Sequence, residues 1–244
     1  SFADESSRVL VENSWRFQDG QSITPEDDSE DAGISTYSLS RLPDGVTAQG
    51  IDVSEHQGNI NWDAVKASGV DFAILRVGFG APSFGGRTDY QFQRNISECE
   101  RLGIPYGIYL YSYAWDDGQA ADEAAFVISN IAGHSPQLPI YYDLEDNSII
   151  ADGRQGGIAS RASVFCNRII NAGYKVGIYA NLNWFNNILT DPVFNSPSWD
   201  HWIAQYNYQC DYAGKYSFWQ YASDGSVDGI SGSVDMNYAY ITIE

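Results

Sequence analysis

The sequence predicts an α/β fold, a TIM-like barrel with a short N-terminal extension. Five short apolar runs alternate with helical segments between residues 50 and 181, a pattern typical of a parallel sheet with right-handed crossovers. Three more apolar runs follow with little helical sequence between them. A regular eightfold barrel has about 250 residues, more than the stretch 50–244 offers. A barrel whose last third has lost its helices fits this pattern.

The expected strands are the apolar runs, and the expected helices lie between the first five of them. Each helical segment has apolar residues at helical spacing and ends on a glycine, the usual C-terminal cap. We therefore expect helices over 61–69, 89–103, 118–133 and 158–173. Strands are expected over 50–54, 72–78, 106–113, 138–145, 175–181, 201–206, 216–222 and 234–241.

Residues 1–49 differ from the rest of the chain in charge. They contain ten acidic residues and three arginines, a net charge of −7. Segment 25–33 is too charged and too poor in apolar residues to be buried, as in a solvated linker. Ahead of it, residues 9–23 alternate around Asp19-Gly20 and predict a small hairpin. We expect a loosely attached arm over 1–49 and one folded domain over 50–244.

The composition excludes several classes of protein. Thirteen basic residues stand against 32 acidic ones, a net charge of −19, so we expect no binding to nucleic acid or anionic lipid, which require clustered cations. The sequence contains no run of about 18 apolar residues, so no membrane span is predicted. The start at Ser1 has no leader pattern, so any signal peptide is expected to have been removed or left out. Cysteine and histidine spacings suit no zinc site, and we expect neither a metal nor a cofactor.

Four carboxylates are the candidate chemical groups. Asp143 and Glu145 are two residues apart at the end of the fourth strand, so their side chains share one face, about 6.6 Å apart along the strand. Two such carboxylates repel, and one can stay protonated as a general acid while the other is ionised. Asp52 ends the first strand and Asp235 begins the last. A closed barrel brings all four to one mouth. The alternatives are solvated or helix-capping acids, or a magnesium or calcium site.

Aromatic residues gather near the same strand ends, and many of them pack in the core. By strand alternation Tyr141 faces inward and Tyr142 faces the helices. Arg76 also faces inward, where a charge needs a partner, and we pair it with the carboxylates. The flat apolar faces of sugar rings stack well on aromatic side chains. We assign to substrate contact Arg76, Tyr109, Tyr111, Tyr179, Trp219 and Gln220.

Several segments together resemble the family 25 glycoside hydrolases, the Chalaropsis-type lysozymes or N-acetylmuramidases. They run in order over about 50–243: GIDVSEHQGNINWDAVKASGVDFAILRVGFG, PIYYDLED, GIYANLNWF, WIAQY and WQYASDGSVDGISGSVDMN. The resemblance implies a (β/α)5(β)3 barrel, five strand–helix units followed by three strands. It also implies cleavage of the β-1,4 bond between N-acetylmuramic acid and N-acetylglucosamine in peptidoglycan.

The resemblance assigns site residues one by one. The family's D-x-E falls on Asp143 and Glu145, its first-strand aspartate on Asp52, and its V-D-M-N aspartate on Asp235. Arg76 and the GFG after it depart from the lysine and T-E-G-like loop expected there, which affects fine substrate contacts and leaves the chemistry intact. Glu145 is the implied general acid, and Asp143 either orients the substrate N-acetyl group or acts as nucleophile.

The implied enzyme is monomeric, acts on peptidoglycan glycan strands, and is secreted or associated with the cell wall. Two alternatives remain open at this point. A related barrel glycosidase would act on a chitin-like polymer, and a wall-binding barrel would have no activity. The presence of all four carboxylates argues against the second. Residues 1–49 lie outside the resemblance, as a linker or as a wall-binding or stalk element.

Overall fold

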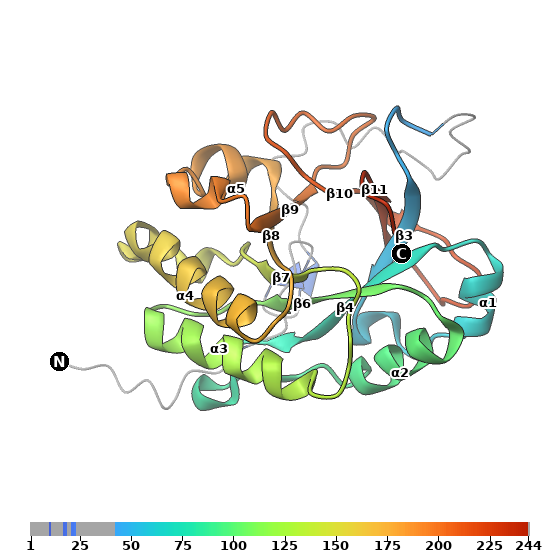
Figure 1. Ribbon diagram of the computed structural model, residues 1–244, viewed down its shortest axis with the longest axis horizontal. Helices are drawn as coiled ribbons and strands as arrows, with labels where there is room; N and C mark the ends of the chain where they lie inside the picture. The colour runs from blue at the N-terminus through green and yellow to red at the C-terminus, as the bar shows by residue number, and fades with distance from the viewer. Residues whose placement is uncertain (1–9, 11–16, 19–20, 23–41, 244) are drawn as a thin grey trace.

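Eight strands close into a barrel in the computed structural model, which describes residues 10, 17–18, 21–22 and 42–243 (Figure 1). The predicted barrel is confirmed. A short strand β5 (Arg87–Thr88) pairs with the end of β4, beyond the point where β3 stops. The barrel strands, in order around the ring, are β3 (Ala48–Val53), β4 (Phe72–Phe79), β6 (Tyr106–Tyr111), β7 (Ile140–Asp143), β8 (Val176–Asn181), β9 (Trp199–Ala204), β10 (Phe218–Gly225) and β11 (Val234–Ala239).

Strand β11 closes the barrel and is antiparallel to both of its neighbours, whereas the other neighbouring pairs in the ring are parallel. The connection from β10 to β11 is a short hairpin, and a short hairpin joins antiparallel strands. Its direction brings the start of β11 to the carboxyl end of β3. Asp235 therefore lies directly opposite Asp52 in the register.

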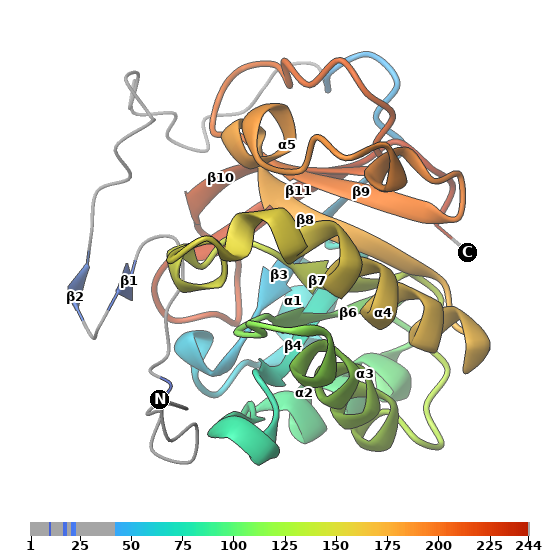
Figure 2. The same ribbon diagram turned by 90° about the vertical axis from the view of Figure 1, so that its left-hand side faces the viewer.

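One α-helix follows each of the first five barrel strands, and among the described residues none follows β9, β10 or β11, as the (β/α)5(β)3 pattern requires (Figures 1 and 2). No helix among the described residues has the length and apolar character needed to cross a membrane. The α-helices are α1 (Trp62–Ala67), α2 (Phe92–Leu102), α3 (Asp117–Asn130), α4 (Ile158–Asn171) and α5 (Leu182–Asn187). Short 3-10 turns are η2 (Glu55–Gln57), η3 (Pro82–Phe84), η4 (Asn147–Ile149), η5 (Arg154–Gly157) and η6 (Pro192–Asn195).

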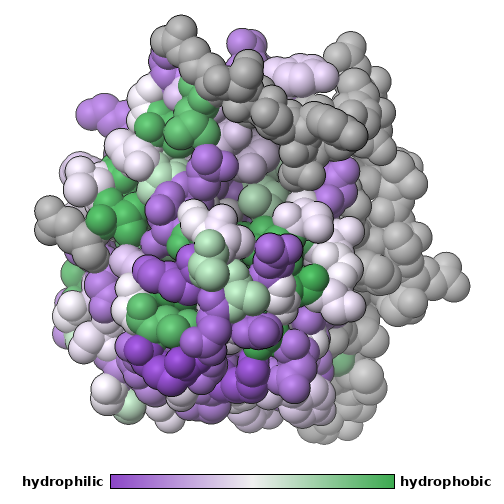
Figure 3. Space-filling model, turned by 90° about the vertical axis from the view of Figure 1, so that its right-hand side faces the viewer, coloured by the Kyte–Doolittle hydropathy of each residue, from purple (hydrophilic) through white to green (hydrophobic). Residues whose placement is uncertain are grey.

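Helix α2 illustrates how the outer helices are built. Phe92, Ile96 and Cys99 face the sheet and are buried, the i, i+4, i+7 spacing of an apolar stripe. On the solvent side Arg101 pairs with Glu98 of the same helix and with Asp63 of α1. Figure 3 shows the face of the molecule beside these helices, where hydrophilic surface predominates in the lower part and apolar patches are small.

Aromatic side chains plug the inside of the barrel. Tyr141 faces inward and packs against Trp202 and Phe218. Tyr142, one residue on, faces outward and stacks on Phe165 of α4 with ring centroids 3.9 Å apart. Both orientations match the predicted alternation. The plug separates the two ends of the barrel, so each end presents its own surface.

Gly177 of β8 leaves room for the Tyr141 ring. A Cβ at this position would lie 2.5 Å from a ring carbon of Tyr141 and 2.7 Å from the carbonyl oxygen of Asp200. Gly177→Ala is therefore expected to lower the free energy of unfolding by about 1–3 kcal/mol, as in other overpacked cores. Urea unfolding checks this, with Gly156→Ala as the control because no atom lies within 4 Å of a Cβ there. Equal effects from the two substitutions would contradict the prediction.

The chain joins the barrel slightly before the expected residue 50. Strand β3 begins at Ala48, and Thr47 already donates from its backbone N–H to Ala239 of β11, at 2.8 Å. Further upstream, Leu10 is half-buried against the apolar cluster that includes Phe79 and Tyr111. Strands β1 (Phe17–Gln18) and β2 (Gln21–Ser22) pair antiparallel, where we expect the hairpin. Its turn at Asp19-Gly20 and the acidic segment 25–33 lie outside the described residues.

A chain beginning at Leu42 is expected to keep the barrel's stability. It retains Thr47, and it loses only the Leu10 contact among the described residues, worth at most about 1 kcal/mol or a few degrees in melting temperature. A chain beginning at Ala48 lacks the Thr47 hydrogen bonds and is expected to melt lower. Thermal unfolding of both chains checks this. A large loss of stability in the longer one would show that the arm is part of the folded domain.

Candidate active site

Four carboxylates from three strands meet at the carboxyl ends of the parallel strands. Asp52 lies on β3, Asp143 ends β7, Glu145 follows two residues later, and Asp235 is on β11. Asp143 interacts electrostatically with both Glu145 and Asp52, and Asp52 is hydrogen-bonded to Asp235. The structure thus brings together the four carboxylates singled out in the sequence. Parallel strands direct their carboxyl ends to one face, which is where barrel enzymes place their sites.

Two side-chain amides hold Asp52 in place. Gln220 Nε2 and Asn237 Nδ2 donate to Oδ2 of Asp52 at 2.8 and 2.7 Å. Asp52 is 4% exposed, and this burial raises its pKa to about 6, against the lowering effect of the hydrogen bonds. The carboxyl group therefore titrates in the mildly acidic range.

A second layer of donors fixes both amides. Tyr179 and Tyr206 each donate a hydroxyl hydrogen bond of 2.9 Å to Oε1 of Gln220. The indole N–H of Trp202 donates to Oδ1 of Asn237 at 2.8 Å. Because these donors occupy the amide oxygens, the amide NH2 groups must point to Asp52. The sequence indicated Gln220 as a substrate contact, and its position makes it a positioning residue for Asp52.

Asp143 and Glu145 form a carboxyl pair that shares a hydrogen bond. Asp143 is 2% exposed, and its Oδ1 accepts no hydrogen bond within the described part of the chain. Burial raises the pKa of Asp143, and the nearby charge of Glu145 raises it further. Glu145 is half-buried. Asp143 is thus the more deeply buried member of the pair, and Glu145 is the more exposed one.

Three of the four predicted aromatic contacts border the carboxylates. Burial raises the pKa of the Tyr109 hydroxyl, and the nearby charges of Asp52, Asp143 and Asp235 raise it further. Burial likewise raises the pKa values of Tyr111 and Tyr179, and the nearby charge of Glu145 adds to the rise in both. The hydroxyl of Tyr111 donates to Asp146 Oδ2 at 3.0 Å, which fixes the orientation of this buried ring.

Trp219 differs from the expectation and lies on the outside of the barrel. It packs against Tyr221 and Tyr238 and donates its indole N–H to the carbonyl of Gln205 at 2.7 Å. The reason is strand alternation: Gln220 faces Asp52 inside the barrel, so its neighbour Trp219 must face outward. The aromatic cluster that contains Trp219 covers the part of β10 and β11 that has no helix.

Arg76 also differs from the expectation, because its ion pair is with residues outside the four carboxylates. Its Nε donates to Asp89 Oδ2 at 2.8 Å, and its Nη2 lies 3.9 Å from Glu55. Strand β5 folds back on β4 and carries Asp89 into reach. Arg76 still lies near enough to Asp143 to oppose the rise of its pKa.

Arg87 extends this network at the rim. It donates to both carboxylate oxygens of Glu55 at 2.8 Å and covers the Tyr90 ring at 3.8 Å. The network ties η2, which follows β3, to the loop after β4. Among the described residues, no group of three His, Cys, Asp or Glu side chains is arranged to hold a metal ion.

A closed β/α barrel with clustered acids at the carboxyl ends of its strands is an architecture that many glycoside hydrolases share. Residues 51–230 match the family model of the glycosyl hydrolases family 25. The chain belongs to this family.

Named relatives and solved structures agree with the family. The chain is similar to lysozyme M1 of Streptomyces globisporus, with 30% identity over 78% of this chain and 66% of the relative. It is 28% identical to the autolytic lysozyme of Clostridium acetobutylicum over 78% of this chain, and it spans 55% of that protein's length. The modular autolysin LytC of Streptococcus pneumoniae, solved with a synthetic peptidoglycan ligand, superimposes with a TM-score of 0.70 and 31% identity, covering 78% of this chain and 46% of LytC. A family 25 hydrolase from Bacillus anthracis shares the fold, with a TM-score of 0.70 and 22% identity over 83% and 93% of the two chains.

Proposed function

We propose that this protein hydrolyses the β-1,4 bond between N-acetylmuramic acid and N-acetylglucosamine in the glycan strands of peptidoglycan. The observation that carries the proposal is the carboxyl pair of buried Asp143 and half-buried Glu145, with Asp52 beside it. Family membership and the peptidoglycan ligand bound by the related autolysin support it. The chain would act as a monomer, secreted or associated with the cell wall.

Glu145 is the proposed general acid. It is the more exposed member of the pair, and therefore the one that reaches the glycosidic oxygen. The proton held by the pair passes from Glu145 to that oxygen as the bond to the anomeric carbon breaks. Burial stabilises the protonated form of Asp143, and the shared hydrogen bond makes its proton available to Glu145.

Asp143 has the proposed role of orienting the substrate. The N-acetyl carbonyl oxygen of the sugar attacks the anomeric carbon, and Asp143 accepts a hydrogen bond from the amide N–H. Water then opens the cyclic intermediate and returns a proton to Glu145. Asp52 and Asp235 stabilise the positive charge that develops on the sugar ring. The alternative is direct attack by Asp143 on the anomeric carbon, which also gives net retention.

The rim aromatics define where the sugar lies. Tyr109 and Tyr111 on β6 and Tyr179 on β8 border the carboxylates from the two strands on either side of β7. A sugar that places its anomeric carbon over Asp143 would meet Tyr109 first, because Tyr109 is half-buried whereas Tyr111 and Tyr179 are buried behind the carboxylates.

Fragment analysis tests the bond that is cut. Peptidoglycan is digested, reduced with borohydride and analysed by mass spectrometry, and reduced N-acetylmuramic acid is the expected new end. Reduced N-acetylglucosamine at that end would overturn the assignment. Rapid hydrolysis of purified chitin oligomers, with walls left intact, would favour a chitin-like substrate instead.

Product stereochemistry and labelling test the route. Retained configuration without a covalent adduct is the expected result. A glycosyl mass shift on the peptide containing Asp143 would establish direct attack, and an inverted product anomer would overturn both retaining routes.

A further inference from the structure

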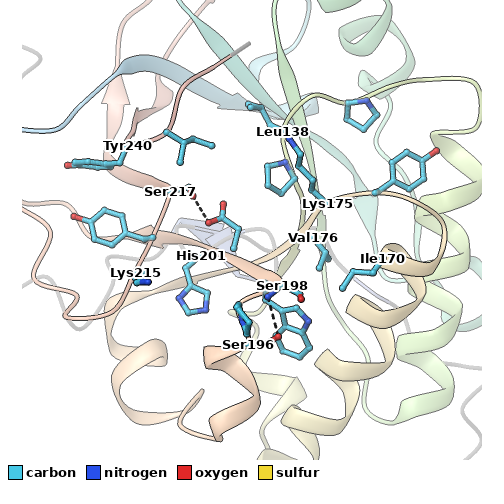
Figure 4. A pocket seen from close by; sticks show the side chains of 18 of the residues that line it. Leu138, Ile170, Lys175, Val176, Ser196, Ser198, His201, Lys215, Ser217 and Tyr240 are labelled. Carbon is cyan, nitrogen blue, oxygen red and sulfur yellow. Dashed lines mark hydrogen bonds between the residues drawn. The ribbon is translucent and has the colours of Figure 1, made fainter.

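A second cleft lies at the end of the barrel opposite the four carboxylates. Its volume is about 1530 Å³, and it opens beside the starts of β7, β8 and β9 (Figure 4). Residues 136–139 lead into β7, and residues 214–217 lead into β10. The four carboxylates, carried by β3, β7 with the residues after it, and β11, lie at the other end of the barrel, beyond the aromatic plug. The cleft is therefore a separate surface whose alteration leaves the proposed catalytic groups in place.

The charge of this cleft is unusual for the molecule. The chain has three lysines and a net charge of −19, yet two of the lysines, Lys175 and Lys215, line this cleft. Figure 4 shows Lys175 and Lys215 on opposite sides of the cleft, with Ser217 on the same side as Lys215. Among the described lining residues, Asp200 is the single acid. An anionic group therefore finds two cations here, of which Lys175 also donates to the carbonyl oxygen of Gln137 at 3.2 Å.

Asp200 forms part of the floor. It accepts hydrogen bonds from the hydroxyls of Tyr141 at 2.6 Å, through Oδ2, and of Ser217 at 2.5 Å, through Oδ1. Each carboxylate oxygen has a second lone pair that an amide or ammonium N–H can use. Tyr141 belongs to the plug, so the floor is fixed by the barrel core. Such an acid disfavours a polyanion and suits a ligand with both N–H donors and carboxylates.

Apolar side chains supply the remaining walls. Leu138, Ile170 and Val176 line one side, and the ring of Tyr240 lies on the other (Figure 4). These apolar surfaces fit the small alkyl side chains of a peptide. A polyol phosphate, which is another kind of anionic ligand, has no such side chains. We propose that this cleft binds a short acidic peptide, with its carboxylates on Lys175 and Lys215 and a backbone or terminal N–H on Asp200.

The proposed ligand has a natural source at the proposed substrate. Peptidoglycan strands carry short peptides with free carboxylates, so the cleft would hold the enzyme on strands that still have them. This consequence rests on the proposed function, whereas the binding itself does not.

Direct binding tests the proposal. The probes are the peptide Ala-Glu-Ala with free carboxylates and its fully amidated counterpart Ala-Gln-Ala-NH2, titrated into the full chain by calorimetry or NMR. We expect the amidated peptide to bind at least 10-fold more weakly. The double variant Lys175→Glu/Lys215→Glu is expected to bind Ala-Glu-Ala at least 10-fold more weakly than the unaltered chain does. A 10-fold weaker Kd corresponds to a loss of about 1.4 kcal/mol in binding free energy.

The third lysine provides a matched control. Lys66 lies on α1, so Lys66→Glu is expected to bind Ala-Glu-Ala as the unaltered chain does. Equal binding of the two peptides, equal losses in Lys66→Glu and the double variant, or tighter binding of a glycerol phosphate oligomer than of the peptide would each overturn the proposal.

Hydrolysis assays separate this proposal from the proposed function. The double variant is expected to hydrolyse soluble glycan without peptides at an unchanged rate and peptide-bearing walls several-fold more slowly. Glu145→Gln is expected to bind Ala-Glu-Ala normally. If the chain lacks hydrolase activity altogether but binds the peptide through the two lysines, the function is wrong and the site stands. If it hydrolyses walls but the lysines do not matter, the site is wrong and the function stands.

Discussion

Glu145→Gln is expected to lower the rate of wall hydrolysis by at least about 10²-fold while the barrel stays folded. Glu145 is half-buried and hydrogen-bonded to Asp143, and glutamine keeps its size and hydrogen-bonding reach. The amide has no proton to give to a leaving oxygen. A loss of rate with an unchanged melting temperature is the result that identifies an acid, since a packing defect would lower both.

The measurement compares initial rates on purified walls for folded variants at equal concentration. Glu98→Gln is the matched control, because Glu98 is an acid on the outer face of α2 whose ion pair with Arg101 is at the surface. It should retain nearly full activity, because exposed ion pairs contribute little. Turnover by Glu145→Gln close to that of the control would remove Glu145 from the mechanism.

Asp52→Asn is expected to make the protein less active and, above pH 6, more stable. Burial raises the pKa of Asp52 to about 6 from the ordinary 3.8. Between these two values the folded state binds more protons than the unfolded state, so the free energy of unfolding contributed by Asp52 falls as pH rises through this window. The contribution is fully present below about pH 4 and is lost above about pH 6. The shift in pKa corresponds to a loss of about 1–3 kcal/mol in the free energy of unfolding between these pH values.

Asparagine at position 52 cannot ionise, so the variant does not lose stability as the pH rises, and the neighbouring hydrogen bonds are kept. Its oxygen can accept from Gln220 and Asn237, and its NH2 group can donate to Asp235. Urea unfolding at several pH values should therefore show a difference between variant and parent that grows from pH 4 to pH 6.5 and then levels off. Activity should fall by at least about 10-fold, because the negative charge that stabilises the sugar cation is gone. A constant stability difference across this range would show that Asp52 titrates normally.

Alternation and strand ends account for the part of the fold that the sequence predicts. The inward Tyr141 and outward Tyr142 follow from the two-residue period of a strand. Helix α5 was implied by the family resemblance but not by the apolar pattern, because six residues are too few to establish a helical period. A local signal exists in the cap, where the Asn181 side chain accepts from the backbone N–H of Trp184 at 2.8 Å. Strand β3 begins earlier than its apolar run because Ala48 pairs with Ala239 of β11, a long-range partner.

Within the site, the four acids could be found because each ends or begins a strand, whereas their partners depend on tertiary contacts. Nothing in the run FAILRVG indicates that Asp89 reaches Arg76, since that requires β5 to fold back. Asn237 was missed although it is two residues after Asp235 and shares its side of β11. Which member of the Asp143–Glu145 pair is more deeply buried also depends on the completed barrel.

The antiparallel strand β11 has a consequence for how the site comes into existence. The hydrogen bond from Asn237 to Asp52 joins residues 185 positions apart, and loops of this length close slowly and late. Until they do, β3 and β10 each present an unpaired edge, the kind of surface on which partly folded chains associate. A chain synthesised only as far as β10 therefore contains three of the four acids and the amide of Gln220, but it lacks both Asp235 and the amide of Asn237 that hold Asp52. Any chemistry that depends on a correctly held Asp52 would thus begin only when β11 makes the final closing contact.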